Sequence, residues 1–283
     1  MIRLKALFYL LAALFLACAE PPKASEEQNV QAVITPTNKV LLSSEIKWEA
    51  LNPARGDQSP KAGTIWGDRK AAVATGFLAQ FVDGFSSPPH IHNVSYRALV
   101  LEGLVHNDDP AAEKMWMPKG SFWTQPAGEA HITAAKGVKC IAYVEIDSGP
   151  YLVKPTEEAF DNGERPVNID IANMVWLDDT ETTMLDAPGV SIAFLWEEDD
   201  LSGNMLKLPP GLKLELSSEG EVFHAVVISG QFDYEMPLSK EVKSLDAGSY
   251  FRSTAKAQHL LSTTAESLLY IRTNGELQVR TSP

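Results

Sequence analysis

Gly84-Phe-Ser-Ser-Pro-Pro-His90-Ile-His92-Asn-Val-Ser-Tyr96 and Gly120-Ser-Phe-Trp-Thr-Gln-Pro126-Ala-Gly128-Glu-Ala-His131 are the two stretches that decide the fold. His90 and His92 are one residue apart, so on a strand, where side chains alternate, both project from the same face. His131 follows a Pro-x-Gly turn at the end of a second expected strand. Three imidazoles that converge from two strands suit a divalent first-row metal. The sequence therefore predicts a metal site made by His90, His92 and His131.

The rest of the chain has the pattern of an all-β protein. From Val40 onward, short apolar runs are separated by Gly, Pro, Asn and Asp, and only residues 154–163 have the features of a short helix. The second half repeats the first weakly at an offset of 127 or 128 residues, which aligns Gly120 with Gly248 and His131 with His259. We expect two tandem antiparallel barrels, at 40–165 and 166–283.

The repeat predicts that only the first barrel binds metal. Ser217 and Glu219 stand where the first half has His90 and His92, and His259 alone remains as a candidate ligand. The second barrel is then a structural partner of the first. A monomer with two barrels is plausible, because similar barrels can cover each other's exposed sheets, although the sequence leaves the oligomeric state open.

The N-terminus has the features of a targeting segment. Arg3 and Lys5 precede a short apolar run that ends at Ala17-Cys18, so residues 1–17 are predicted to be a cleaved signal peptide. The box around Cys18 resembles that of bacterial lipoproteins, and an ordinary secretory signal is the alternative. Residues 18–39 are polar and are expected to form a flexible tether. These features predict a protein of the bacterial cell envelope, held at the membrane by a lipid on Cys18 and exposed to the periplasm or exterior.

The charge narrows the set of partners. The chain carries a net charge of −13, and loss of the signal peptide would make it −15. An acidic chain of this kind argues against nucleic-acid binding and against a polybasic membrane patch. Cys140 lies in the apolar run 140–144 and is expected to be an inert core thiol.

The two stretches resemble the two motifs of the cupin superfamily. The residues that fit both in type and in spacing are Gly84, His90, His92, Gly103, Gly120, Pro126, Gly128 and His131. The chain departs from the motifs at Tyr96, where the family has Glu, and at Ala135, where it has Asn. The resemblance implies a bicupin, with two small antiparallel barrels and a metal inside the first.

The site is similar to that of three-histidine cupin dioxygenases, and to the zinc cupin domain of an anti-sigma factor, which keeps the Glu. Over residues 40–283 the arrangement resembles a family of bacterial bicupins built on a domain of unknown function. The resemblance implies a metal-dependent cupin, of which an Fe(II)-type dioxygenase is the most concrete version. The alternative is a metal-containing binding or sensing module without turnover. One divalent ion is expected, and histidines alone do not choose among Fe, Zn, Ni, Mn and Cu.

The missing carboxylate predicts the kind of ligand. Neutral imidazoles do not offset the +2 charge of a divalent ion, and an uncompensated positive charge favours a small anionic or enolisable compound as the ligand. Tyr96 is a candidate to donate a hydrogen bond to that ligand, with metal binding as phenolate the alternative. Glu145, on a late strand, is a candidate general base or supporting group, with a surface charge the alternative. His106 is expected in a solvated turn.

Overall fold

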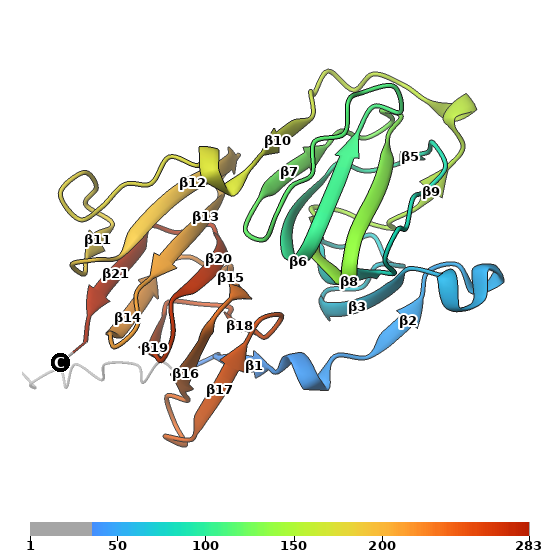
Figure 1. Cartoon of the computed structure of the whole chain (residues 1–283). Coiled ribbons are helices and arrows are strands. Elements are labelled where there is room, and N and C mark those ends of the chain that lie inside the picture. The colour runs from blue at the N-terminus through green and yellow to red at the C-terminus, as the bar shows by residue number, and fades with distance from the viewer. Residues whose placement is uncertain (1–35, 283) are drawn as a thin grey trace, which may run out of the picture. The chain divides into compact units, whose positions relative to one another are not determined.

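The computed structural model describes residues 36–282, which lie in one compact unit whose regular secondary structure is almost entirely β-strand (Figure 1). The predicted signal peptide, Cys18 and most of the predicted tether lie outside the described residues. No helix in this described part is long and apolar enough to cross a membrane. The helix expected within 154–163 is a single 3-10 turn, η3 (Thr156–Glu158).

The first half forms a seven-stranded antiparallel sheet with the order β10-β7-β6-β8-β4-β3-β2, and a ribbon of β5 and β9. Its strands are β2 (Trp48–Ala50), β3 (Lys61–Trp66), β4 (Thr75–Phe81), β5 (Ile91–His92), β6 (Tyr96–Asp108), β7 (Phe122–Gln125), β8 (Ile132–Ile146) and β9 (Val153–Lys154). Two 3-10 helices precede or interrupt them, η1 (Ser43–Glu45) and η2 (Pro53–Gln58). Phe77, Ala98, Val100 and Trp123 belong to the core of this barrel.

The second half forms a six-stranded sheet with the order β11-β21-β14-β19-β16-β17 and contributes five strands to another, β1-β18-β15-β20-β13-β12. Its strands are β11 (Leu185–Asp186), β12 (Ser191–Glu198), β13 (Leu201–Leu208), β14 (Lys213–Ser218), β15 (Phe223–Ser229), β16 (Gln231–Glu235), β17 (Val242–Asp246), β18 (Tyr250–Ser253), β19 (Ala257–Thr263), β20 (Ser267–Thr273) and β21 (Leu277–Thr281). Apart from the short parallel pair β11 and β21, the pairing is antiparallel. The architecture is the predicted pair of cupin-type barrels.

Each half of the chain contributes one short strand to a sheet of the other half. Strand β1 (Lys39–Leu41) precedes the first barrel but pairs with β18 of the second, whereas β10 (Val167–Ile169), which follows the turn η3 and precedes the turn η4 (Ile171–Asn173), pairs with β7 of the first. The two contributed strands are equivalent in the repeat, 128 residues apart. The exchange gives each of the strands β7 and β18 a partner, so the three-residue strands β1 and β10 become the edges of these sheets.

Strands of the first barrel are buried on both faces. On β6, Ala98 and Val100 pack into the barrel, whereas Leu99 and Leu101 pack into a second core that also contains Met205 and other residues of the second half. A strand buried on both faces reads as a continuous apolar run, which is the pattern of residues 98–101.

A buried ion pair lies where the halves meet. Glu145, at the end of β8, accepts hydrogen bonds from the hydroxyls of Tyr143 (2.8 Å) and Tyr270 (2.7 Å), and the Arg272 guanidinium lies 3.3 Å from its carboxylate. Both charged side chains are at most 3% exposed. Asp147, 2.6 Å from Arg272, adds a second negative charge. The network satisfies the charges that the packing of the two halves buries.

Removing one member of the ion pair should destabilise the protein more than removing both members. Arg272→Met should lower the free energy of unfolding by about 3–5 kcal/mol, because it leaves the Glu145 carboxylate buried without its cation. The double variant Glu145→Met/Arg272→Met should recover much of that loss. Urea unfolding measures both, and Arg165→Gln, which removes an exposed partner of Asp161, is the control with little expected change. Equal stability of Arg272→Met and wild type would contradict this account of the contact.

Candidate metal centre

The structure brings the three predicted histidines together. His90 and His131 form an isolated antiparallel bridge, with both backbone N–H···O distances 3.0 Å, and His92 ends strand β5. Alternation along the chain turns His90 and His92 to the same side. One ring nitrogen from each histidine lies within 4.8 Å of the others, and no other such group of His, Cys, Asp or Glu occurs in residues 36–282.

Backbone carbonyls fix the orientation of the rings. The Nδ1 atoms lie at hydrogen-bond distance from carbonyl oxygens: His90 from Pro88 at 2.9 Å, His92 from Leu152 at 3.0 Å and His131 from Glu129 at 3.1 Å. A carbonyl only accepts, so each Nδ1 carries the proton and each Nε2 keeps its lone pair. This arrangement is how metal-binding histidines are usually oriented.

Burial keeps the rings neutral. Desolvation, with a smaller effect of the neighbouring imidazoles, lowers the pKa of His131 to about 3 and that of His92 well below its usual range. The pKa of His90 is also lowered by burial. Within the described part of the chain, His131 Nε2 is buried without a hydrogen-bond partner. Neutral rings and an unsatisfied inward lone pair are the donor set that a divalent ion requires.

Tyr151 is a site residue that the sequence analysis missed. It lies in the loop between β8 and β9, its ring stacks on His92 with centroids 4.3 Å apart, and its hydroxyl is 3.1 Å from His92 Nε2. Because that nitrogen has a lone pair, the hydroxyl donates to it. Tyr151 belongs to no recognisable motif. It lies near His92 because the following strand, β9, pairs with β5.

Tyr96 lies in the predicted cavity, but its hydroxyl points into a polar cluster. The hydroxyl donates to Asn107 Oδ1 at 3.0 Å, which also accepts from Thr133 at 2.8 Å, and the Asn107 amide donates to Gln125. Burial raises the pKa of Tyr96 far above its ordinary value. The hydroxyl therefore keeps its proton and uses it on Asn107, so donation to a bound ligand would require that bond to break.

Two polar residues are not where the sequence analysis expected them. Glu145 lies on the opposite face of β8 from the cavity-lining Val144, in the ion pair with Arg272, so the structure does not bring it to the histidines. His106 is not a solvated loop residue: it is in β6 and only 1% exposed, with Nδ1 3.2 Å from the Met115 carbonyl oxygen. For Glu145 the prediction lacked the phase of the strand alternation, and for His106 it ended the strand too early, since β6 continues to Asp108.

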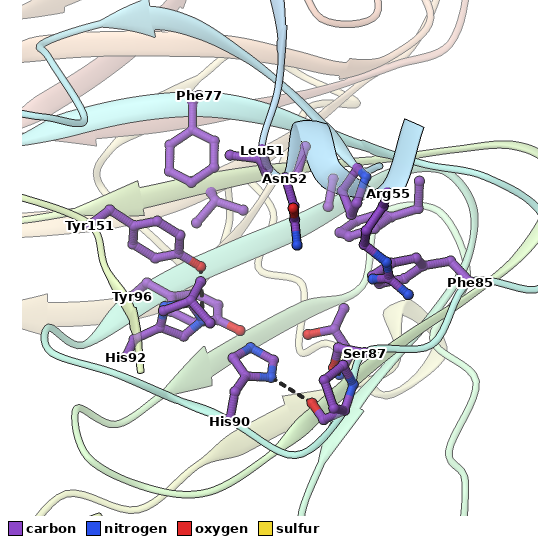
Figure 2. Close-up of a pocket in the computed structure, with 18 of the residues that line it drawn as sticks. Leu51, Asn52, Arg55, Phe77, Phe85, Ser87, His90, His92, Tyr96 and Tyr151 are labelled. Carbon is purple, nitrogen blue, oxygen red and sulfur yellow. Dashed lines mark hydrogen bonds between the residues drawn. The ribbon is translucent and has the colours of Figure 1, made fainter. Parts of the chain in front are cut away.

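His90 and His92 line a cavity of about 310 Å³ with mainly apolar walls (Figure 2). The His131 ring lies beside them, with its centroid 4.3 Å from that of His90 and 5.2 Å from that of His92. Aromatic rings form much of the lining, namely Phe77, Phe81, Phe85, Tyr96, Trp123 and Tyr151. Leu51, Asn52 and Arg55 line it from the segment that carries η2. The cavity has the size and character of a small-molecule site.

The equivalent position in the second barrel is filled. Phe223 stacks on His259 with centroids 4.3 Å apart, and Tyr234 stands where the first barrel has the smaller Asn107. The Tyr234 hydroxyl lies 2.8 Å from His259 Nδ1, and Ser253 lies 3.3 Å from Nε2. His259 is thus a packed core residue whose two nitrogens both have partners.

The chain belongs to the family described as a domain of unknown function, DUF4437, whose model matches residues 39–280. No curated protein matches the sequence. The fold is similar to those of several solved structures, each of which has low sequence identity to this chain.

A provisionally assigned dioxygenase from Nostoc punctiforme is 12% identical, with a TM-score of 0.66 over 88% of this chain and 87% of that one. Salicylate 1,2-dioxygenase from Pseudoaminobacter salicylatoxidans, solved with gentisate, is 12% identical, with a TM-score of 0.57 over 87% and 85%. Oxalate decarboxylase from Lactobacillus farciminis, solved with formate, is 9% identical, with a TM-score of 0.56 over 88% and 89%. At these identities the similarity establishes the bicupin fold.

The contact of Tyr151 with His92 predicts that its hydroxyl competes with a metal ion. Tyr151→Phe keeps the stacked ring and removes the donor, a bond worth about 1 kcal/mol, so the Kd for Zn²⁺ should fall about fivefold. Competition against a chromophoric chelator measures it. Tyr96→Phe, whose hydroxyl is engaged with Asn107, is the matched control and should leave the Kd unchanged. Weaker Zn²⁺ binding by Tyr151→Phe would instead make the phenol oxygen a ligand.

Proposed function

We propose that this chain is a metal-dependent cupin enzyme, a mononuclear Fe(II) dioxygenase acting on a small anionic or enolisable compound. The observation that carries the proposal is the convergence of three neutral imidazoles, each with its Nδ1 proton held by a backbone carbonyl, beside one apolar cavity that His90 and His92 line. His90, His92 and His131 would hold the ion. When bound, it would supply Lewis acidity and a place for dioxygen and substrate to meet.

The composition of the cavity supports an anionic ligand. No Asp or Glu is among the described residues that line it, and the imidazoles are neutral, so no protein charge would offset that of a divalent ion. An enolisable compound bound as its anion would supply that charge. Because a dioxygenase places both oxygen atoms in one substrate, the substrate also supplies the electrons.

The walls of the cavity would position the substrate and limit water. Phe77 and Trp123 offer flat apolar surfaces, and Tyr151 lies beside the imidazole of His92. Flat rings favour a planar ligand through stacking and apolar burial. The solved dioxygenase and decarboxylase that share the fold carry gentisate and formate, which are small carboxylic acids, and this supports the same class of ligand here.

A second candidate is a metal-containing binding or sensing module without turnover. The observation in its favour is the lack of a general base: within the described residues, the lining has no carboxylate, and Glu145 lies in the contact between the halves. A reaction that needs a protein group to remove a proton would therefore be slow in this cavity.

Oxygen consumption separates the two candidates. Protein loaded anaerobically with Fe(II) is given β-diketones, hydroxyaryl ketones and hydroxyaryl carboxylates in turn, and dissolved oxygen is followed. We expect at least one compound to cause uptake of one dioxygen per substrate, and His131→Asn to abolish it. Binding of compounds from the panel with no uptake by any of them would contradict the enzyme and favour the binding module.

A further inference from the structure

Arg55 is the one formally charged side chain of the described cavity lining. It lies on η2, between β2 and β3, and its guanidinium carbon is 5.1 Å from the centre of the Phe85 ring. Figure 2 shows the Arg55 guanidinium and the Asn52 amide both directed into the cavity. The lining thus has a cation at the η2 side and imidazole lone pairs elsewhere, with apolar walls between.

The Arg55 guanidinium lacks a carboxylate partner. Arg69, Arg97 and Arg272 each pair with Asp or Glu. No Asp or Glu oxygen in the described part of the chain lies within 4.0 Å of a side-chain nitrogen of Arg55. In a chain with 37 acidic residues against 24 basic ones, an unpaired arginine at a cavity is available for an anion from solution.

The segment that presents Arg55 is tied at its base. Leu51 N–H donates to the Pro60 carbonyl at 2.8 Å, and Asn52 N–H donates to the hydroxyl of the buried Ser59 at 2.9 Å. Arg55 N–H donates to the Asn52 carbonyl at 3.0 Å. These hydrogen bonds and the contact with the Phe85 ring hold the Arg55 side chain near the cavity. Its N–H groups can then bind a ligand with little further loss of side-chain entropy.

The cavity volume limits the body of the ligand. An apolar cavity of roughly 150 Å³ accommodates benzene, so about 310 Å³ holds one substituted ring or an aliphatic chain of similar bulk. With one cation in the lining, a monoanion matches the charge. A guanidinium suits a carboxylate, which it can bind through two parallel hydrogen bonds.

We propose that Arg55, assisted by Asn52, binds the carboxylate of a small monocarboxylic acid with an aromatic or apolar body, so that the rest of the ligand extends toward the imidazoles. The inference rests on the proposed function in that it assigns the same cavity as the ligand site. It differs from the proposed function because the ligand's carboxylate binds Arg55 and not the metal, so that a different group of the ligand lies near the imidazoles. Arg55 is thereby a specificity-determining residue.

The test uses chelator-treated protein, so that it does not depend on metal or turnover. Calorimetry compares benzoate with benzamide and hexanoate with hexanamide. Charge-assisted hydrogen bonds predict that each acid binds at least about 10-fold more tightly than its amide at low salt, with a smaller ratio at high salt because Arg55 is exposed. Arg55→Gln should abolish the ratio and Arg55→Lys should keep part of it.

Arg165→Gln removes the same charge from a residue outside this cavity and should leave the ratio unchanged. The inference is overturned if no acid binds more tightly than its amide, or if Arg55→Gln keeps the preference. A preference that depends on Arg55, in a protein that consumes no oxygen with any compound, would uphold the inference and defeat only the proposed dioxygenase.

Discussion

Three neutral imidazoles that face one another inside an apolar barrel are the constraint on which the rest of the first half depends. Each ring gives its Nδ1 proton to a backbone carbonyl, so the Nε2 lone pairs are left to point inward. A buried acceptor without a partner costs about 1–3 kcal/mol, and His131 Nε2 is such an atom among the described residues. A divalent cation bound to this lone pair would remove the cost. The surrounding apolar walls would strengthen the electrostatic attraction between the cation and an anionic ligand.

The second barrel supports the first without copying its site. Tyr234 occupies the space that the smaller Asn107 leaves open, and Phe223 stacks on His259, so one barrel encloses a cavity and the other a packed core. Glu145 and Arg272, equivalent positions of the repeat, meet where the halves pack. If two identical barrels packed in this way, the same residue from each would meet, and the two charges would have the same sign. Because the two halves of this chain differ in sequence, one position is Glu145 and the other is Arg272, and the two form an ion pair. The exchanged strands β1 and β10 bind the halves further.

The sequence predicted the fold and the three histidines because both depend on local spacing. Period-two alternation puts His90 and His92 on one face, and the resemblance to the two cupin motifs implies that His131 joins them. Glu145 was misplaced because β8 is buried on both faces, so its apolar pattern does not say which face meets the cavity. Tyr151 and Arg55 were missed because each reaches the cavity from a connection between strands, and no motif encodes the path of such a connection.

Elemental analysis of the protein purified without added metal tests the central claim most directly, when wild type is compared with His90→Ala, His131→Ala and His259→Ala. The account predicts one divalent ion per chain in wild type and in His259→Ala, and none in either first-barrel variant. Metal-free wild type that also takes up no Zn²⁺ or Fe²⁺ on titration would contradict it, as would two ions per chain or loss of the ion in His259→Ala.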